Sequence, residues 1–271
     1  GPFPEDLMIS PRIAPHMVGL GLLEAIPQER LEELSDPDDD NADGVSGRVQ
    51  WLDTESGPQI GRFGWKGDAP TVEVQVAGAF AGDMGLTSAL IPIDDCTTEQ
   101  HVCLEEPDGG DPEVDETVFS RVVLYSSALA VPARRAASDE TVLAGKGLFR
   151  QVGCDDCHTP SHTTGEAAIP EFEGLLIWPY TDLLLHDMGE GLADDRPVGS
   201  ANGREWKTPP LWGVGLIESV NKHTRFLHDG RARSLEEAVL WHGGEAQASR
   251  LAFMNLTADE RAALLTFVED L

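Results

Sequence analysis

The run Gly153–Pro160 constrains this chain more than any other feature. It reads Gly-Cys-Asp-Asp-Cys-His-Thr-Pro, so Cys154 and Cys157 are two residues apart and His158 follows directly. Cys-x-x-Cys-His is the attachment signature of c-type haem, in which two thiols bond to the porphyrin and the next imidazole ligates iron. A zinc half-site would need a second ligand pair, and a redox dithiol would not need His158. The motif therefore predicts one covalent haem c.

Helical segments flank this motif. The spacing of apolar residues predicts a helix over 139–151, capped by Ser138 and leading into the attachment loop. The run Thr257–Glu260 has the pattern of a capping box, and apolar residues at helical spacing follow it to Val268. A first and a last helix that pack on each other through a glycine and aromatic residues are typical of cytochrome c domains.

The remaining patterns favour a mainly α fold of cytochrome c-like domains with long irregular loops around haem. Helices are expected over 28–34, 71–80 and 113–130, whereas 160–233 is rich in Gly, Pro and Trp with little periodicity. A linker at 133–137 divides the chain into two predicted domains, residues 1–135 and 136–271, of which the second carries the haem.

Acidic residues dominate the charge. The chain of 271 residues has 48 Asp and Glu against 19 Lys and Arg, which gives a net charge of −29. Such a field repels nucleic acids and anionic membrane surfaces and attracts cationic partners, so we expect a cationic redox protein as partner. No apolar run is long enough to span a membrane, and because no basic and apolar leader is present we expect any export signal to have been removed.

Two segments resemble each other. Residues 66–76 align with 229–239, which pairs Gly67 with Gly230 and Thr71 with Ser234. Each segment reads as a tight turn, a hydroxyl N-cap and a helix with an acid in its first turn. The alternative is coincidence, because capped helix starts are common; we favour two related halves.

Longer runs resemble the bacterial di-haem c-type oxidoreductases, a family of thiol oxidoreductases or peroxidases, and more distantly the di-haem cytochrome c peroxidases and quinone-cofactor-maturing enzymes. The resemblance covers essentially the whole chain and is carried by Gly61–Lys66, Gly82–Ser88, Tyr180–Gly189, Arg204–Gly213 and Leu227–Glu245. It implies a periplasmic or extracellular oxidoreductase with two haems, one for electron entry and one for peroxide or substrate chemistry.

The chain departs from that family in one respect. Family members carry an additional Cys-x-x-Cys-His upstream of the segment that resembles Ser10–Pro15, and this sequence begins without it. The resemblance therefore implies that residues 1–135 are the remainder of a first cytochrome c-like domain. We expect a second haem to come from a missing segment or a partner chain. The alternative to an enzyme is a pure electron-carrier cytochrome.

The resemblance also implies the second axial ligand of the attached haem. The peroxidases have a turn that resembles His228-Asp-Gly230, and their second ligand lies fourteen residues after its histidine. In this chain that position is His242. Bis-histidine ligation favours electron transfer over oxygen chemistry. The alternatives are Met188, His186, an open position, or a histidine that merely satisfies a helix C-terminus.

Two further residues are candidates by resemblance. Asp83 stands before Met-Gly, where the peroxidases have a glutamate that moves a proton on bound peroxide, so it is the catalytic candidate, with a surface or capping role as the alternative. Trp65 is a candidate electron relay between two haems, with a place in the core as the alternative.

A calcium ion is the second cofactor that the sequence suggests. Asp39, Asn41 and Asp43 offer oxygen donors at alternate positions, Gly44 gives the sharp turn, and the Val45 carbonyl is seventh. Position twelve is Gln50 instead of a bidentate Glu, so Asp36, Asp53 or water would complete the shell. The alternative is a solvated acidic loop.

The other two cysteines are expected to pair. Cys96 and Cys103 lie in a polar loop, and in an exported protein a disulfide is their natural state. Acidic neighbours such as Asp94 and Asp95 would raise a thiol pKa, which argues against a catalytic thiolate.

Overall fold

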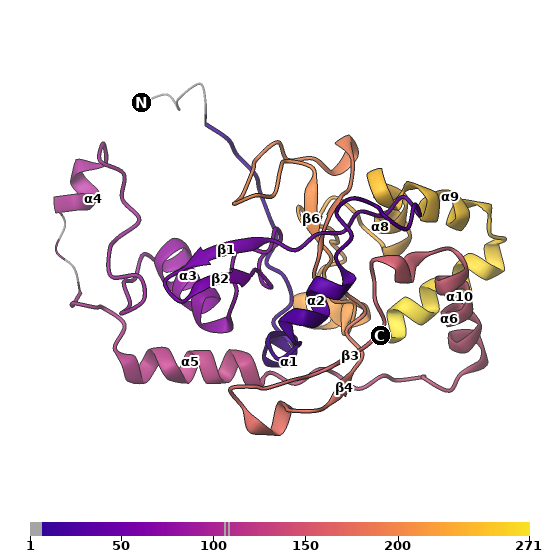
Figure 1. Ribbon diagram of the computed structural model, residues 1–271, viewed down its shortest axis with the longest axis horizontal. Coiled ribbons are helices and arrows are strands. Elements are labelled where there is room, and N and C mark those ends of the chain that lie inside the picture. The colour runs from indigo at the N-terminus through magenta and orange to yellow at the C-terminus, as the bar shows by residue number, and fades with distance from the viewer. Residues whose placement is uncertain (1–6, 106, 108) are drawn as a thin grey trace.

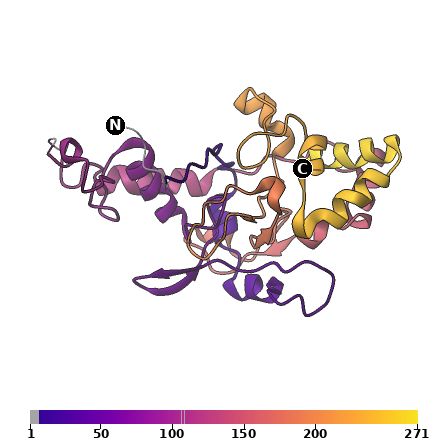
Figure 2. The same cartoon turned by 90° about the horizontal axis from the view of Figure 1, so that it is seen from above.

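The computed structural model describes residues 7–105, 107 and 109–271. Residues 1–6, 106 and 108, which belong to the predicted first domain, lie outside this description. The chain is mainly α-helical and elongated, with α3–α5, β1 and β2 toward one end and α6, α9 and α10 at the other (Figures 1 and 2). Within the described residues no helix is long and apolar enough to cross a membrane.

The first half consists of short helices around one β-hairpin. Its elements are α1 (Leu20–Glu24), α2 (Gln28–Leu34), β1 (Trp51–Thr54), β2 (Gly57–Ile60), α3 (Val72–Met84), α4 (His101–Glu105) and α5 (Glu116–Ala128). Strands β1 and β2 pair antiparallel, with Trp51 opposite Ile60. The predicted helices are present, but two have different ends. The helix predicted over 113–130 begins at Glu116 and ends at Ala128, and α3 continues to Met84 and ends at Gly85, which adopts a left-handed conformation at φ 65°.

The second half consists of short helices and 3-10 turns joined by long loops with little β-structure, as the sequence predicted for residues 160–233. Its α-helices are α6 (Glu140–Gln151), α7 (Ile217–Asn221), α8 (Leu235–Trp241), α9 (Gln247–Asn255) and α10 (Ala258–Asp270). Its 3-10 turns are η1 (Cys154–Asp156), η2 (Pro170–Phe172), η3 (Glu190–Leu192), η4 (Val214–Leu216) and η5 (Gly244–Ala246). Between α6 and α7 the strands form only two antiparallel pairs, β3 (His162–Thr163) with β4 (Leu176–Ile177) and β5 (Leu185–Asp187) with β6 (Glu205–Lys207).

The first and last helices of this half cross closely. A Cβ on Gly145 of α6 would lie 2.0 Å from the Ala263 carbonyl of α10, so only glycine permits this approach. Phe149 and Phe267 meet edge to face at 5.4 Å beside the crossing. The capping box of Thr257 and Glu260 is present as predicted. The predicted cap Ser138 is wrong, because the Asp139 carboxylate accepts the backbone N–H groups of Thr141 and Val142 instead.

Buried side chains form two clusters. One gathers residues between Leu20 and Phe119 with Ile177, Leu183, Leu184 and Trp212, and the other lies within residues 142–271. The segment 177–212 therefore packs against both. Asp270 at the end of α10 accepts hydrogen bonds from Arg134, Arg135 and Ala136, which fixes the connection between the halves. The boundary at 135/136 stays a prediction.

The resemblance between the two segments extends to their backbone. In each copy a phenylalanine forms a β-bridge with an alanine, a glycine adopts positive φ, and a hydroxyl side chain caps the next helix. The corresponding pairs are Phe63 with Phe226, Ala69 with Ala232, Gly67 with Gly230 and Thr71 with Ser234. In the same alignment Trp65 corresponds to His228. The two rings pack edge to face with their centroids 6.4 Å apart.

Candidate functional site

The attachment loop is a tight turn directly after α6. Gly153 adopts φ 80°, and a Cβ there would lie 2.8 Å from an Asp156 carboxylate oxygen. The 3-10 turn η1 follows, and the His158 amide donates to the Cys154 carbonyl at 3.0 Å. Both cysteines are free and half-buried. Burial raises the pKa of Cys154 to about 12 and raises that of Cys157, so neither thiol has the thiolate character of a redox dithiol.

His158 is held in one tautomer. Its Nδ1 lies 3.0 Å from the backbone carbonyl of Tyr180, and because a carbonyl only accepts, Nδ1 must carry the hydrogen. Nε2 is then unprotonated and free to bind a metal, which is how ligating histidines are usually oriented. Burial lowers the pKa of His158 to about 4, so the imidazole is neutral at pH 7.

His242 repeats this arrangement on α8. It follows the last helical residue, and its Nδ1 lies 2.8 Å from the Ala238 carbonyl. Nε2 is again the unprotonated nitrogen. Burial lowers the pKa of His242 also, so its imidazole is neutral. His158 and His242 are therefore both neutral imidazoles with an unprotonated Nε2.

One cavity of about 250 Å³ joins these residues. Its lining includes Cys154, Cys157, His158 and His242, and most of its wall is apolar. The apolar residues come from α6, η4, α7, α8 and α10: Phe149, Val214, Ile217, Leu235, Val239, Leu264, Leu265 and Val268. Paired thiols, two neutral imidazoles and apolar walls match the donors and surface of a covalently bound haem. The residues present fit that group.

The other candidate ligands differ in availability. Both ring nitrogens of buried His186 are engaged, Nε2 by Asp182 at 2.9 Å and Nδ1 by Glu245 at 2.8 Å. Burial alone would lower the pKa of His186, but Asp182 raises it well above its ordinary value. A doubly bonded imidazolium has no free lone pair for iron. Met188 lines the same cavity and stays an alternative.

Glu245 connects three segments beside His242. Its carboxylate accepts from His186, from both the amide and the hydroxyl of Ser46 at 3.0 Å, and from the Asp187 amide at 2.9 Å. Ser46 belongs to the acidic loop before β1, so that loop is tied to the attachment site. The sequence interpretation missed Glu245, although it lies inside the run Leu227–Glu245 that carried the family resemblance.

Trp65 and Asp83 have different surroundings. Trp65 lines the cavity and donates from Nε1 to the Ile13 carbonyl at 2.7 Å. Asp83 is exposed near the end of α3 and is not among the residues that line this cavity. The structure therefore brings Trp65 to the predicted haem and does not bring Asp83 there.

The acidic loop uses its side chains to hold its own backbone. Asp39 accepts from Gly44, Asn41 from Asp43, and Asp43 from Val45. Gln50 is buried and bonds to Val198 and Ser200, so it is committed away from the loop. No group of three metal-ligating side chains is assembled among the described residues. Calcium stays a prediction.

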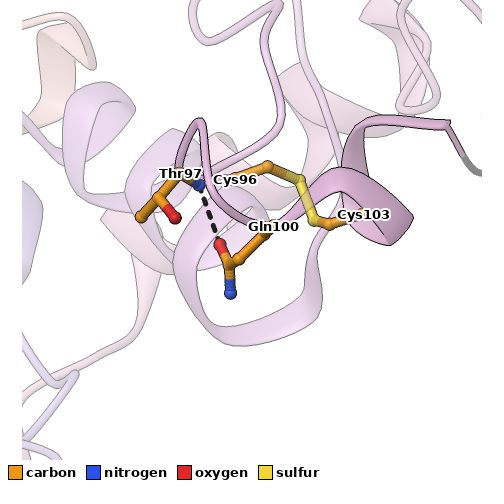
Figure 3. The surroundings of a disulfide bond; sticks show 4 residues. All are labelled: Cys96, Thr97, Gln100 and Cys103. Carbon is orange, nitrogen blue, oxygen red and sulfur yellow. Dashed lines mark hydrogen bonds between the residues drawn. A yellow bond between two sulfur atoms is a disulfide. The ribbon is translucent and has the colours of Figure 1, made fainter. Parts of the chain in front are cut away.

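Cys96 and Cys103 are bonded to each other as a disulfide (Figure 3), and α4, which contains Cys103, lies at the opposite end of the molecule from α6 and α10 (Figure 1). The amide of Thr97 donates to the Gln100 side chain within the closed loop. Neither cysteine lines the cavity around Cys154, so this disulfide is separate from the predicted haem site.

The chain matches one protein-family model and, at low identity, several solved structures. Residues 3–271 match the model of the family described as "Di-haem oxidoreductase, putative peroxidase". No curated protein matches the chain. A solved MauG-like protein associated with microbial copper homeostasis is 18% identical with a TM-score of 0.44, covering 100% of this chain and 95% of that one. Hydrazine synthase of Kuenenia stuttgartiensis is 17% identical with a TM-score of 0.36, covering 100% and 98%. Similarity this low carries no argument about function.

Proposed function

The chain belongs to the di-haem oxidoreductase family, and from that premise we propose that it binds one haem c covalently through Cys154 and Cys157, with His158 and His242 as axial ligands. The bound haem would supply one-electron transfer at its iron. We further propose that this chain passes electrons to or from a second haem site, as part of a peroxidase-like oxidoreductase.

One observation carries the ligand assignment. Two histidines on different segments line one cavity, and each gives its Nδ1 hydrogen to a main-chain carbonyl, Tyr180 for His158 and Ala238 for His242. Backbone carbonyls cannot move away as side chains can, so both rings are oriented before any ligand arrives. If His158 and His242 both held the iron, no position would stay open on it, which would suit electron transfer and would give a lower potential than histidine and methionine together.

The residues around the cavity support electron transfer from the attached haem to a second haem site. Trp65 lines the same cavity and is fixed by its hydrogen bond to Ile13, so we propose it as the relay toward the second site. In the register that relates Trp65 to His228, His242 corresponds to Ala79 of α3, which has no group that could ligate iron. That difference favours unlike haem sites, one closed and one open, over two equivalent electron carriers. A catalytic role of Asp83 belongs to that second site and stays a prediction.

Two properties of the chain bear on location and partners. The proposed covalent haem and the disulfide between Cys96 and Cys103 both favour an oxidising compartment, so we propose a periplasmic or extracellular location. The net charge of −29 favours a cationic redox partner, whose association rate would fall as salt is added.

Haem stoichiometry and peroxide reactivity test this function. The pyridine haemochrome assay should give at least one covalent haem per chain, and protein that carries the second haem should oxidise a reduced cationic cytochrome when peroxide is added. A protein with haem bound and only low-spin iron, inert to peroxide, would instead be the pure electron carrier.

A further inference from the structure

Two lysines are buried, Lys66 and Lys207, and their surroundings differ. Lys66 is fully buried, and its ammonium is satisfied by the carbonyls of Asn202 at 2.6 Å and Glu205 at 3.1 Å and by the Asp194 carboxylate at 3.1 Å. Three acceptors match the three hydrogens of an ammonium group. Lys66 is therefore a paired structural lysine.

Lys207, the last residue of β6, has no such partners. Its side chain is 6% exposed, and its Nζ makes one long hydrogen bond of 3.4 Å to the carbonyl of the next residue, Thr208. Across the described part of the chain no carboxylate lies within 4.0 Å of this ammonium. Lys207 lines the cavity that holds Cys154, Cys157, His158 and His242.

The nearest carboxylates do not pair with the Lys207 ammonium. Asp182 is committed to the Leu184 amide and to His186, both at 2.9 Å, and Asp68 is exposed. Burial lowers the pKa of Lys207 to about 8 even though both carboxylates act in the opposite direction. Of the two arginines that line the cavity, Arg225 is exposed, whereas Arg250 is half-buried and its Nε has no hydrogen-bond partner among the described residues.

A buried ammonium without an acceptor is costly, so an anion is expected to lie against it. The wall of this cavity is mostly apolar, and the group that fits the cavity carries two propionate carboxylates. We propose that the ammonium of Lys207 binds a haem propionate, which makes Lys207 a haem-binding residue. This inference rests on the proposed function, because it concerns the same cavity. The propionate belongs either to the haem on Cys154 and Cys157 or to the second haem of the family.

The pairing has a measurable electrical consequence. An ionised propionate stabilises ferric iron, and an ammonium beside it offsets that effect, so Lys207 raises the midpoint potential. The ammonium also keeps the carboxyl ionised at lower pH. Without it, the propionate takes up a proton at higher pH, and the potential becomes pH-dependent in the range where the wild-type potential is flat.

Three variants of the haem-loaded protein test the assignment. Lys207→Met keeps the length and removes the charge, Lys207→Arg restores a cation, and Lys222→Met removes an exposed lysine on the segment between cavity residues Asn221 and His223. The readouts are haem stoichiometry, spin state, midpoint potential from pH 5 to 9, and redox-difference infrared spectra with ¹³C-labelled propionates.

Lys207→Met should keep its haem and spin state, lower the midpoint potential, and shift the labelled carboxylate band. Lys207→Arg should restore most of both signals, and Lys222→Met should match the wild type. The haem whose potential falls identifies the owner of the propionate. A Lys207→Met protein with wild-type potential and carboxylate band overturns the inference. If that variant fails to mature, the wild-type infrared titration decides, because a propionate that protonates at the same pH as in water would overturn it. Absence of covalent haem from the wild type would instead overturn the proposed function.

Discussion

His158 donates its Nδ1 hydrogen to the backbone carbonyl of Tyr180 across 3.0 Å. Tyr180 is buried, has φ 54°, and its ring packs edge to face on Phe149 of α6 and Phe267 of α10. The crossing of the two terminal helices therefore positions the carbonyl that orients the predicted ligand. Stability of the crossing and orientation of the imidazole are linked through one residue.

Gly145→Ala tests the crossing. The added methyl would meet the Ala263 carbonyl, so we expect a loss of about 1–3 kcal/mol in the free energy of unfolding. Gly147→Ala is the matched control on the same helix, because its Cβ would meet open space and alanine favours a helix by up to about 1 kcal/mol. Urea unfolding of the haem-loaded protein compares them. Equal stabilities of the two variants would show that the crossing tolerates a side chain.

Glu245→Ala tests the support of the His242 loop. The substitution leaves the His186 imidazolium with one carboxylate and removes the acceptor of the Ser46 and Asp187 amides. We therefore expect the free energy of unfolding to fall by about 3–5 kcal/mol and the absorption spectrum to show a high-spin fraction. Glu190→Ala is the control, since Glu190 is 81% exposed and pairs only at the surface with Arg204. Spectra identical to wild type would mean that Glu245 does not position His242.

Asp194→Asn gives a pH-dependent prediction. Burial opposes ionisation of Asp194, but hydrogen bonds from Ser10, Arg12 and Lys66 lower its pKa well below the ordinary value. A lowered carboxyl pKa stabilises the fold above about pH 4 and loses that contribution as pH falls through the folded value. We expect the variant to be less stable by about 3 kcal/mol at pH 7.

The stability difference between wild type and Asp194→Asn should therefore shrink below pH 4. Urea unfolding at pH 7, 4 and 3 measures it. A difference that is constant over this range would contradict the role assigned to the ionised carboxylate.

Calcium is tested by thermal unfolding with calcium and with chelator. A site that uses Asp39, Asn41 and Asp43 should raise the melting temperature as calcium increases, because a ligand that binds only the folded state stabilises it. Asp43→Asn can keep the hydrogen bond from Val45 while it removes the charge, so it should weaken the calcium effect without disturbing the loop. Identical melting temperatures with calcium and with chelator would contradict the calcium site and favour a solvated acidic loop that binds no metal.

Local patterns were predictable from the sequence, and distant contacts were not. The capping box at Thr257, the N-cap at Ser234 and the turn at Gly230 depend on residues a few positions apart, and each is present. At the start of α6 two adjacent residues could cap, and the sequence does not rank Ser138 against Asp139. The contact of Glu245 with Ser46 joins residues 199 positions apart, and the isolation of Lys207 depends on what Asp182 already binds.

The spin state of the attached haem tests the central claim most directly. Absorption and electron paramagnetic resonance spectra of the ferric wild-type protein should show low-spin iron with two imidazole ligands at the haem on Cys154 and Cys157. His242→Ala should convert that haem to high spin and let added imidazole restore the low-spin spectrum, while Met188→Leu should leave it unchanged. A low-spin haem that persists unchanged in His242→Ala would contradict the ligand assignment.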